Sequence, residues 1–153
     1  MIWVRIDNRL IHGQVIETWL PYIGARLILV ANDELAKDDL QREIMSLAIP
    51  GNTRSSFAKV DAVSQTLAAA MGPKPMDALV LFSNCPDARR SFDAGFGFDV
   101  LNVGNIHYSP GRRQLSPSVA VNERDEECLR YFRKRGVRLD FRCVPNDPVQ
   151  VKF

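Results

Sequence analysis

The sequence has few of the residues that build metal and redox sites. Of its 153 residues, two are histidines and three are cysteines. His12 and His107 stand far apart, and neither an H-x-x-H nor a C-x-x-C spacing occurs. Because protein zinc sites combine closely spaced ligands of these types, the sequence predicts no metal site and no metallo-hydrolase. An odd number of cysteines without a close pair favours reduced thiols and a cytoplasmic protein.

A strong excess of charge and a long apolar run are also absent. The chain has 20 Lys and Arg against 18 Asp and Glu, a net charge of +2, which is too small to indicate a nucleic-acid partner. No apolar stretch approaches the roughly 20 residues that span a bilayer. The composition, with 46% hydrophobic and 25% charged residues, is that of a globular protein. At about 150 residues per domain, we expect one domain covering residues 1–153.

Short apolar runs alternate with amphipathic segments along the chain. The runs predict strands at 2–6, 27–31, 56–60, 78–82, 99–103 and 118–121, with a last strand near 149–152. Helices are predicted at 13–23, 40–48, 63–71 (capped by Asp61), 86–94 and 123–135. This alternation is typical of an α/β fold, with a mainly parallel central sheet and helices on both faces. Residues 137–143 alternate apolar and polar side chains, which predicts an antiparallel edge strand near the C-terminus.

The loop after the first strand carries the most informative residues. His12 stands at the start of the first predicted helix, where free backbone N–H groups and the helix dipole favour an anion. Arg9 adds a guanidinium suited to phosphate, and Gly13 lets a ligand approach the backbone closely. Gln14 can donate or accept a hydrogen bond. These residue types together suit a phosphate site.

Two interpretations of this loop are open on the residues alone. An unprotonated imidazole nitrogen is a nucleophile toward phosphorus, so His12 can be a phosphoacceptor at the place where phosphate binds. Alternatively, His12 caps the helix and Arg9 pairs with Asp7. A nucleotide-binding module is not indicated: the chain has no G-x-x-x-x-G-K-[ST] motif, and the pair Gly95 and Gly97 lacks a third glycine and precedes a strand.

Residues 5–15 read Arg-Ile-Asp-Asn-Arg-Leu-Ile-His-Gly-Gln-Val. This string resembles the phosphorylation-site signature of the IIB components of the mannose/sorbose family of the sugar phosphotransferase system. The usual family string has Asp where this chain has Asn8, and both residues suit a tight turn. The resemblance continues through residues 30–34, 102–104, 111–115 and 136–147.

The resemblance implies a phosphohistidine carrier with an α/β fold and no cofactor. Such a carrier accepts a phosphoryl group from the phosphorylated IIA component and passes it to a sugar held by the IIC/IID membrane permease. His12 is then the acceptor through its Nδ1 atom, Arg9 neutralises the phosphoryl charge, and Asp7 orients the loop or the ring. A cytoplasmic location at the permease is implied, and members of the family often form homodimers. A regulatory relative that is phosphorylated but serves no permease is the alternative.

Further candidate residues lie beyond other predicted strands. Asp33 either fixes His12 or starts a turn, while Ser83 and Asn84 either donate to phosphate or cap a helix. Cys85 follows the same strand and is interpreted as structural. Basic groups and the second histidine, which either meet a partner or are simply solvated, are His107, Arg112, Arg113 and the helix face Arg130, Arg133 and Lys134.

Overall fold

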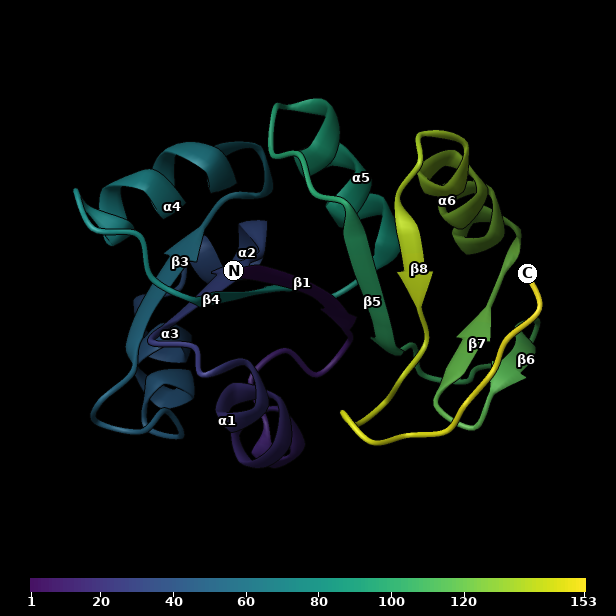
Figure 1. Cartoon of the computed structure of the whole chain (residues 1–153), viewed down its shortest axis with the longest axis horizontal. Coiled ribbons are helices and arrows are strands. Elements are labelled where there is room, and N and C mark those ends of the chain that lie inside the picture. Colours follow the sequence, from purple (N-terminus) through teal and green to yellow (C-terminus); the bar gives the residue numbers. More distant parts are fainter.

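A six-stranded sheet forms the centre of the protein, described by a computed structural model of residues 1–153 (Figure 1). Its order is β3-β2-β4-β1-β5-β8, and every neighbouring pair of strands is parallel. The strands are β1 (Ile2–Asp7), β2 (Leu27–Ala31), β3 (Arg54–Ala58), β4 (Ala78–Phe82), β5 (Val100–Asn105) and β8 (Arg138–Asp140). The predicted fold class is therefore confirmed.

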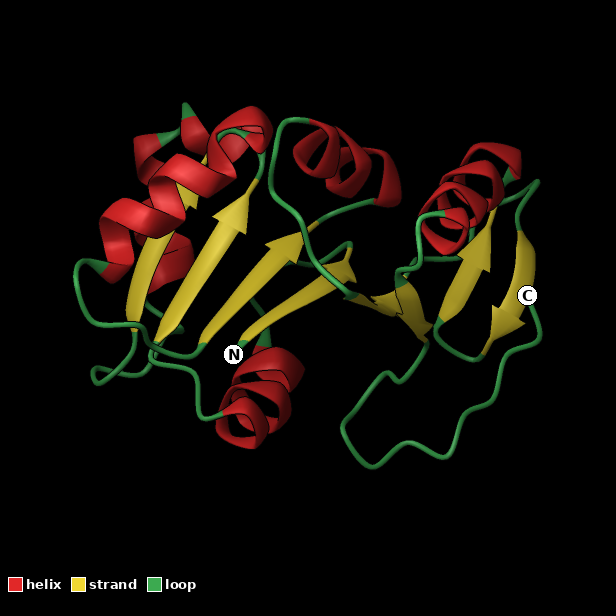
Figure 2. Cartoon of the chain, turned by 45° about the horizontal axis from the view of Figure 1, so that its top comes forward, coloured by secondary structure: helices red, strands yellow, loops and turns green.

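Helices cover both faces of this sheet, as Figure 2 shows by colour. Their bounds are η1 (Val15–Trp19), α1 (Leu20–Ile23), α2 (Asp33–Ala36), α3 (Asp39–Ser46), η2 (Val60–Ala62), α4 (Val63–Met71), α5 (Cys85–Asp93) and α6 (Glu123–Lys134). One core lies beneath α4, α5 and α6, and a smaller core lies beneath η1 and α1, with α2 and α3 packed against it. No helix combines the length and apolar character that crossing a bilayer requires.

The central strands β2 and β4 are buried along their whole length. Alternate side chains of each strand enter opposite cores: Leu27 and Leu29 face one, while Ile28 and Val30 face the other. This two-sided burial explains why the sequence has unbroken apolar runs here rather than an alternating pattern. Strand β1 lies beside the buried strand β4, between β4 and β5, and leads into the candidate site.

The strand near the C-terminus is parallel, so the predicted antiparallel direction is wrong. Residues 100–102 of β5 lie opposite residues 138–140 of β8 in parallel register. Helix α6 precedes β8 and returns the chain to the end of the sheet at which the parallel strands begin, as a parallel neighbour of β5 requires (Figure 1). The alternating pattern indicates an edge strand with an exposed residue, Arg138, but it carries no information on direction.

Three smaller predictions also differ from the structure. The chain forms no strand at 149–152, although Val149 and Val151 still pack against the larger core. The predicted strand at 118–121 is β7 (Val119–Val121), which pairs with β6 (Arg113–Ser116) in a separate two-stranded antiparallel sheet. Asp61 caps no helix; it lies inside η2 and pairs with Arg90.

Candidate functional site

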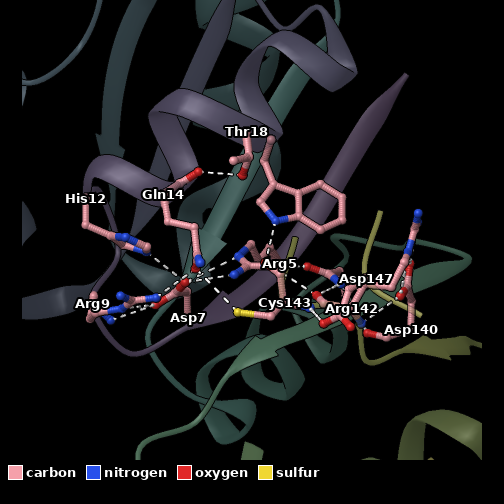
Figure 3. Close-up of polar contacts among 12 residues, drawn as sticks. Arg5, Asp7, Arg9, His12, Gln14, Thr18, Asp140, Arg142, Cys143 and Asp147 are labelled. Carbon is pink, nitrogen blue, oxygen red and sulfur yellow. Dashed lines mark hydrogen bonds and ion pairs between the residues drawn. The ribbon is translucent and has the colours of Figure 1, made fainter. Parts of the chain in front are cut away.

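The loop after β1 is organised around the carboxylate of Asp7, which is fully buried (Figure 3). Oδ1 accepts the backbone N–H of Arg9 at 3.0 Å, and Oδ2 accepts Nη2 of Arg5 at 3.0 Å and lies 2.8 Å from Nε2 of His12. Leu10 completes the turn with a left-handed φ of 59°, and its own side chain is buried. That conformation costs free energy for a leucine, so burial and the Asp7 contacts hold the loop in one shape.

The surroundings of Asp7 favour its charged form. Burial alone would raise its pKa, but the hydrogen bond from His12, the charge of Arg5 and the Arg9 amide together lower the pKa below its usual value. Asp7 is therefore an ionised acceptor at neutral pH. With His12 neutral, the charges of Arg5, Arg9 and Asp7 sum to +1, an electrostatic environment suited to an incoming anion.

The charge on Asp7 fixes which nitrogen of His12 carries the proton. An ionised carboxylate only accepts hydrogen bonds, so Nε2 must be the protonated nitrogen that donates to Oδ2. In the neutral ring Nδ1 then keeps its lone pair, and no group of the chain forms a hydrogen bond with it. The side chain of His12 is 15% exposed, so the ring is held in place but can still be reached. The ring contacts Asp7 and caps no helix.

Arg9 and the start of the helical segment border the same ring. Arg9 has a side chain 44% exposed; its Nη2 donates to Oε1 of Gln14 at 3.1 Å, and its Nε lies 3.4 Å from Oδ1 of Asp7. The pairing of Arg9 with Asp7 that the alternative interpretation required is thus present but long. The backbone N–H groups of Gly13 and Gln14 donate to no group of the chain. They are free for an anion.

The helix predicted at 13–23 begins with an irregular section. Residues 15–19 form the π-helix η1, followed by α1 up to Gly24, whose φ of 68° ends the helix. Within this section Oγ1 of Thr18 donates to the carbonyl of Gln14 at 2.6 Å. Short π-helical sections occur frequently at functional sites.

A buried layer behind Asp7 was not predicted from the sequence. Nη1 of Arg5 donates to Oδ1 of Asn102 at 2.6 Å and to the carbonyl of Arg142 at 3.3 Å. Gly104 of β5 lies so close to the guanidinium of Arg5 that a Cβ there would overlap it. The available signal was an arginine inside the otherwise apolar stretch Ile2–Ile6, because a cation buried in a sheet requires a partner.

The segment after β8 also reaches the site from the far end of the chain. The carbonyl oxygen of Cys143 accepts a hydrogen bond from Nε1 of Trp19 at 2.8 Å. The Sγ atom of Cys143 lies 3.4 Å from Oε1 of Gln14. The guanidinium of Arg142 lies over Trp19 and is paired with Asp140. Residues 140–143 thus support the helix start that borders His12 (Figure 3).

The other predicted residues have partners away from the His12 loop. Oδ1 of Asp33 accepts the N–H of Val60, and Oδ2 pairs with Arg90. Asn84 caps α5 through the N–H of Asp87 and donates to Ser83. None of Asp33, Ser83 and Asn84 forms a hydrogen bond with the loop.

Four further candidates, Arg112, Arg113, Cys85 and His107, form no hydrogen bond with the His12 loop. Arg112 pairs with Asp125 and Arg113 with Glu126, so both arginines tie the β6–β7 sheet to α6. Cys85 is buried beside Cys128, and burial raises the pKa of its thiol, which is the setting of a structural cysteine. His107 is exposed and forms no hydrogen bond.

Comparison with known proteins gives a consistent result. Residues 1–151 match the family model described as the sorbose subfamily IIB component of the PTS system. The chain is 35% identical to the PTS system sorbose-specific EIIB component of Klebsiella pneumoniae, over 94% of this chain and 87% of that protein. It is 33% identical to the PTS system mannose-specific EIIAB component of Escherichia coli strain K12, over 94% of this chain and 44% of that longer protein.

Solved structures agree in fold as well as in sequence. The crystal structure of the PTS system N-acetylgalactosamine-specific IIB component 1 from Escherichia coli superposes with a TM-score of 0.88 and 31% identity. The match covers 100% of this chain and 99% of that one. The similarity therefore extends over the whole sheet and both helical layers.

Proposed function

The chain belongs to the sorbose subfamily of IIB components of the sugar phosphotransferase system, and on this premise we propose that it carries the phosphoryl group on Nδ1 of His12. IIB components of this system are sugar phosphotransferases, so the chain is a transferase of sugar transport. The observation that carries the proposal is the 2.8 Å contact between Nε2 of His12 and the ionised Asp7. It leaves Nδ1 as the free nucleophile.

The proposed transfer has two steps. In the first, the lone pair of Nδ1 forms a bond to phosphorus while the bond from phosphorus to the donor nitrogen breaks, and its electron pair returns to the donor ring. In the second, a sugar hydroxyl oxygen attacks the phosphorus, the hydroxyl proton is released to water, and the N–P electron pair returns to Nδ1. Because both exchanged bonds of the first step are N–P bonds of similar energy, that step is reversible.

The neighbouring residues then have distinct roles. The transition state of phosphoryl transfer spreads negative charge over the equatorial oxygens, so catalysis is mostly positioning and positive electrostatics. Arg9 and the free N–H groups of Gly13 and Gln14 supply donors beside the ring. The attacking ring gains positive charge, which the carboxylate of Asp7 stabilises through Nε2–H.

The partners follow from the same proposal. The donor is a phosphorylated IIA component; the EIIAB name of the mannose-specific relative indicates that both functions occur there in one chain. The acceptor is a sugar bound by the IIC/IID permease, which would place the protein in the cytoplasm at the membrane surface. Homodimer formation remains part of the proposal. The names of these relatives specify three different sugars, so they assign no sugar to this chain.

The test separates the carrier from a purely regulatory relative. Phosphorylated IIA of the mannose family is incubated with the protein, and 31P and 15N NMR then identify the phosphorylated nitrogen. Membrane vesicles containing the cognate IIC/IID and labelled sugar are added next. A carrier gives Nδ1-phosphohistidine that disappears as sugar phosphate forms. Stable phosphohistidine without sugar phosphate, with vesicles proven active, would favour the regulatory alternative, and phosphorylation at another atom would refute the proposal.

A further inference from the structure

Arg5 is the one fully buried cation of the protein, and it lies directly behind the candidate site. Removing a guanidinium from water costs several kcal/mol, so its partners must compensate closely. Burial lowers its pKa, and the charge of Asp7 works in the opposite direction. Its two arms point to different groups: Nε and Nη2 reach Oδ2 of Asp7 at 3.3 and 3.0 Å, and Nη1 reaches Oδ1 of Asn102 at 2.6 Å.

The same oxygen of Asp7 faces both Arg5 and His12. Oδ2 therefore receives the guanidinium from one side and Nε2–H from the other, at 3.0 and 2.8 Å. A shift of Arg5 therefore changes the position and the basicity of Oδ2, the atom that accepts the hydrogen bond from Nε2–H of His12. Arg5 forms no hydrogen bond with His12, so its hydrogen-bonded link to the ring runs through Asp7.

The place of Arg5 is determined by β5 and by the segment after β8. Gly104 leaves the space that the guanidinium fills, and a Cβ at this position would overlap the guanidinium group. Asn102 accepts from Arg5 and donates through Nδ2 to the carbonyls of Asp140 and Arg142 at 3.2 and 3.0 Å. The φ of Gly104 is not in the left-handed region, so the reason for glycine here is space rather than backbone conformation.

From these contacts we propose that Arg5 is a positioning residue for phosphoryl transfer: seated by Gly104 and Asn102, it holds Asp7 so that the His12 proton stays on Nε2. The proposal rests on the proposed function at His12. It assigns a role to a residue that touches neither the phosphoryl group nor either partner. It also predicts that a methyl group added at Gly104 of β5, where the nearest atoms belong to the guanidinium of Arg5, changes the tautomer of His12.

The test compares Gly104→Ala with the matched control Gly97→Ala. A Cβ at Gly97 meets no atom within 4 Å and its φ is ordinary, so this control adds the same methyl group in open space. The tautomer of unphosphorylated His12 is read from 15N chemical shifts of the ring. The rate of phosphoryl acceptance from IIA is measured separately and normalised to the folded fraction.

For Gly104→Ala we expect a substantial population of the Nδ1–H tautomer and a rate reduced about 10- to 100-fold. This is the range found when a group that orients a metal-binding histidine is removed. Gly97→Ala should match the unaltered protein in both measurements. An unchanged tautomer and rate in folded Gly104→Ala would overturn the proposal. The tautomer needs no phosphoryl donor, so this result is distinct from a failure of the protein to accept phosphate at all.

A second variant keeps the proposal testable if Gly104→Ala does not fold. Arg5→Lys retains the charge, but a single ammonium group cannot reproduce the planar fork that joins Asp7 to Asn102. It should show the same tautomer change. Where both variants fold, the double variant Arg5→Lys/Gly104→Ala should be no slower than Arg5→Lys alone, because the smaller cation no longer meets the added methyl group. Strictly additive losses, or a native tautomer in Arg5→Lys, would contradict the role of Arg5.

Discussion

Replacing Asp7 with asparagine tests the contact between Oδ2 of Asp7 and Nε2 of His12, on which the organisation of the site depends. The change keeps the shape of the side chain but removes one acceptor oxygen and the charge. Oδ1 and Oδ2 both accept donors in the native loop, from the Arg9 amide and from Arg5 and His12. Asparagine offers one oxygen and one NH2 group, so its NH2 group, itself a donor, must point at a donor on one of the two sides.

The expected losses follow from burial. Asp7 and Arg5 are both 0% exposed, and removing one partner of a buried ion pair costs about 3–5 kcal/mol. If the NH2 group of the introduced asparagine faces the ring, Nε2 of His12 must accept, which moves the ring proton to Nδ1. An incorrect histidine tautomer of this kind lowers catalysis by about 10⁴-fold in a serine protease, an unrelated protein. For Asp7→Asn we expect the acceptance rate to fall by about 10²- to 10⁴-fold.

The assay measures single-turnover transfer from phosphorylated IIA by rapid quenching, in parallel with thermal unfolding of the same sample. Rates are corrected for the folded fraction, because an unfolding free energy of about 5–15 kcal/mol is typical of a domain and the loss is a large part of it. An Asp7→Asn variant that is folded and accepts the phosphoryl group on Nδ1 within about threefold of the native rate would refute the role of the carboxylate, since the expected loss is far larger.

Three other changes test separate contacts. Arg9→Ala should slow acceptance by at least about tenfold with little change in melting temperature, since the side chain is 44% exposed, and Arg9→Lys should recover only part of the rate in the same quench assay. A Cβ at Gly13 meets no atom of the chain within 4 Å, so circular dichroism should show unchanged stability for Gly13→Ala. A slower transfer from IIA would show that the added methyl group obstructs the approach of the partner. An unchanged rate would show that Gly13 does not lie on the approach path. Burial alone would raise the pKa of Asp140, but the hydrogen bonds and charge of Arg142 outweigh this effect and lower the pKa. The ionised carboxylate therefore stabilises the fold fully at pH values above the ordinary aspartate pKa of about 3.9. This contribution to the free energy of unfolding is lost as the pH falls through the lowered pKa. Urea unfolding of Asp140→Asn should therefore show a shallower loss of stability below about pH 4 than the native chain, and parallel slopes would contradict this.

The parts of the fold that follow from local patterns were predictable. The apolar runs at 27–31 and 78–82 are the fully buried strands β2 and β4, because two-sided burial leaves no polar positions. The residue types of the polar loop ending at His12, and its place before a helix, predicted a setting suited to phosphate; the choice of His12 as a functional residue followed from the resemblance to the IIB family. The structure brings Asp7, Arg9, His12 and Gln14 together there.

Features that depend on distant contacts were not predictable in the same way. The direction of β8 depends on the crossing of α6, and an edge strand alternates in either direction. The contacts of Arg5 with Asn102 and Arg142 join residues 97 and 137 positions apart in sequence. Cys143 reaches Gln14 across 129 positions. No spacing rule relates such pairs; they become neighbours only when β1, β5 and β8 share one sheet.

The most direct test of the central claim compares the two histidines of the chain. The native protein, His12→Ala and His107→Ala are each incubated with phosphoenolpyruvate, Enzyme I, HPr and a mannose-family IIA component, and their intact masses are measured. His107 is the matched control, because it is exposed and forms no hydrogen bond. We predict one acid-labile phosphoryl group on the native protein and on His107→Ala, and none on His12→Ala. Phosphorylation of His12→Ala, or its loss in His107→Ala alone, would contradict the assignment of His12 as the phosphoryl carrier.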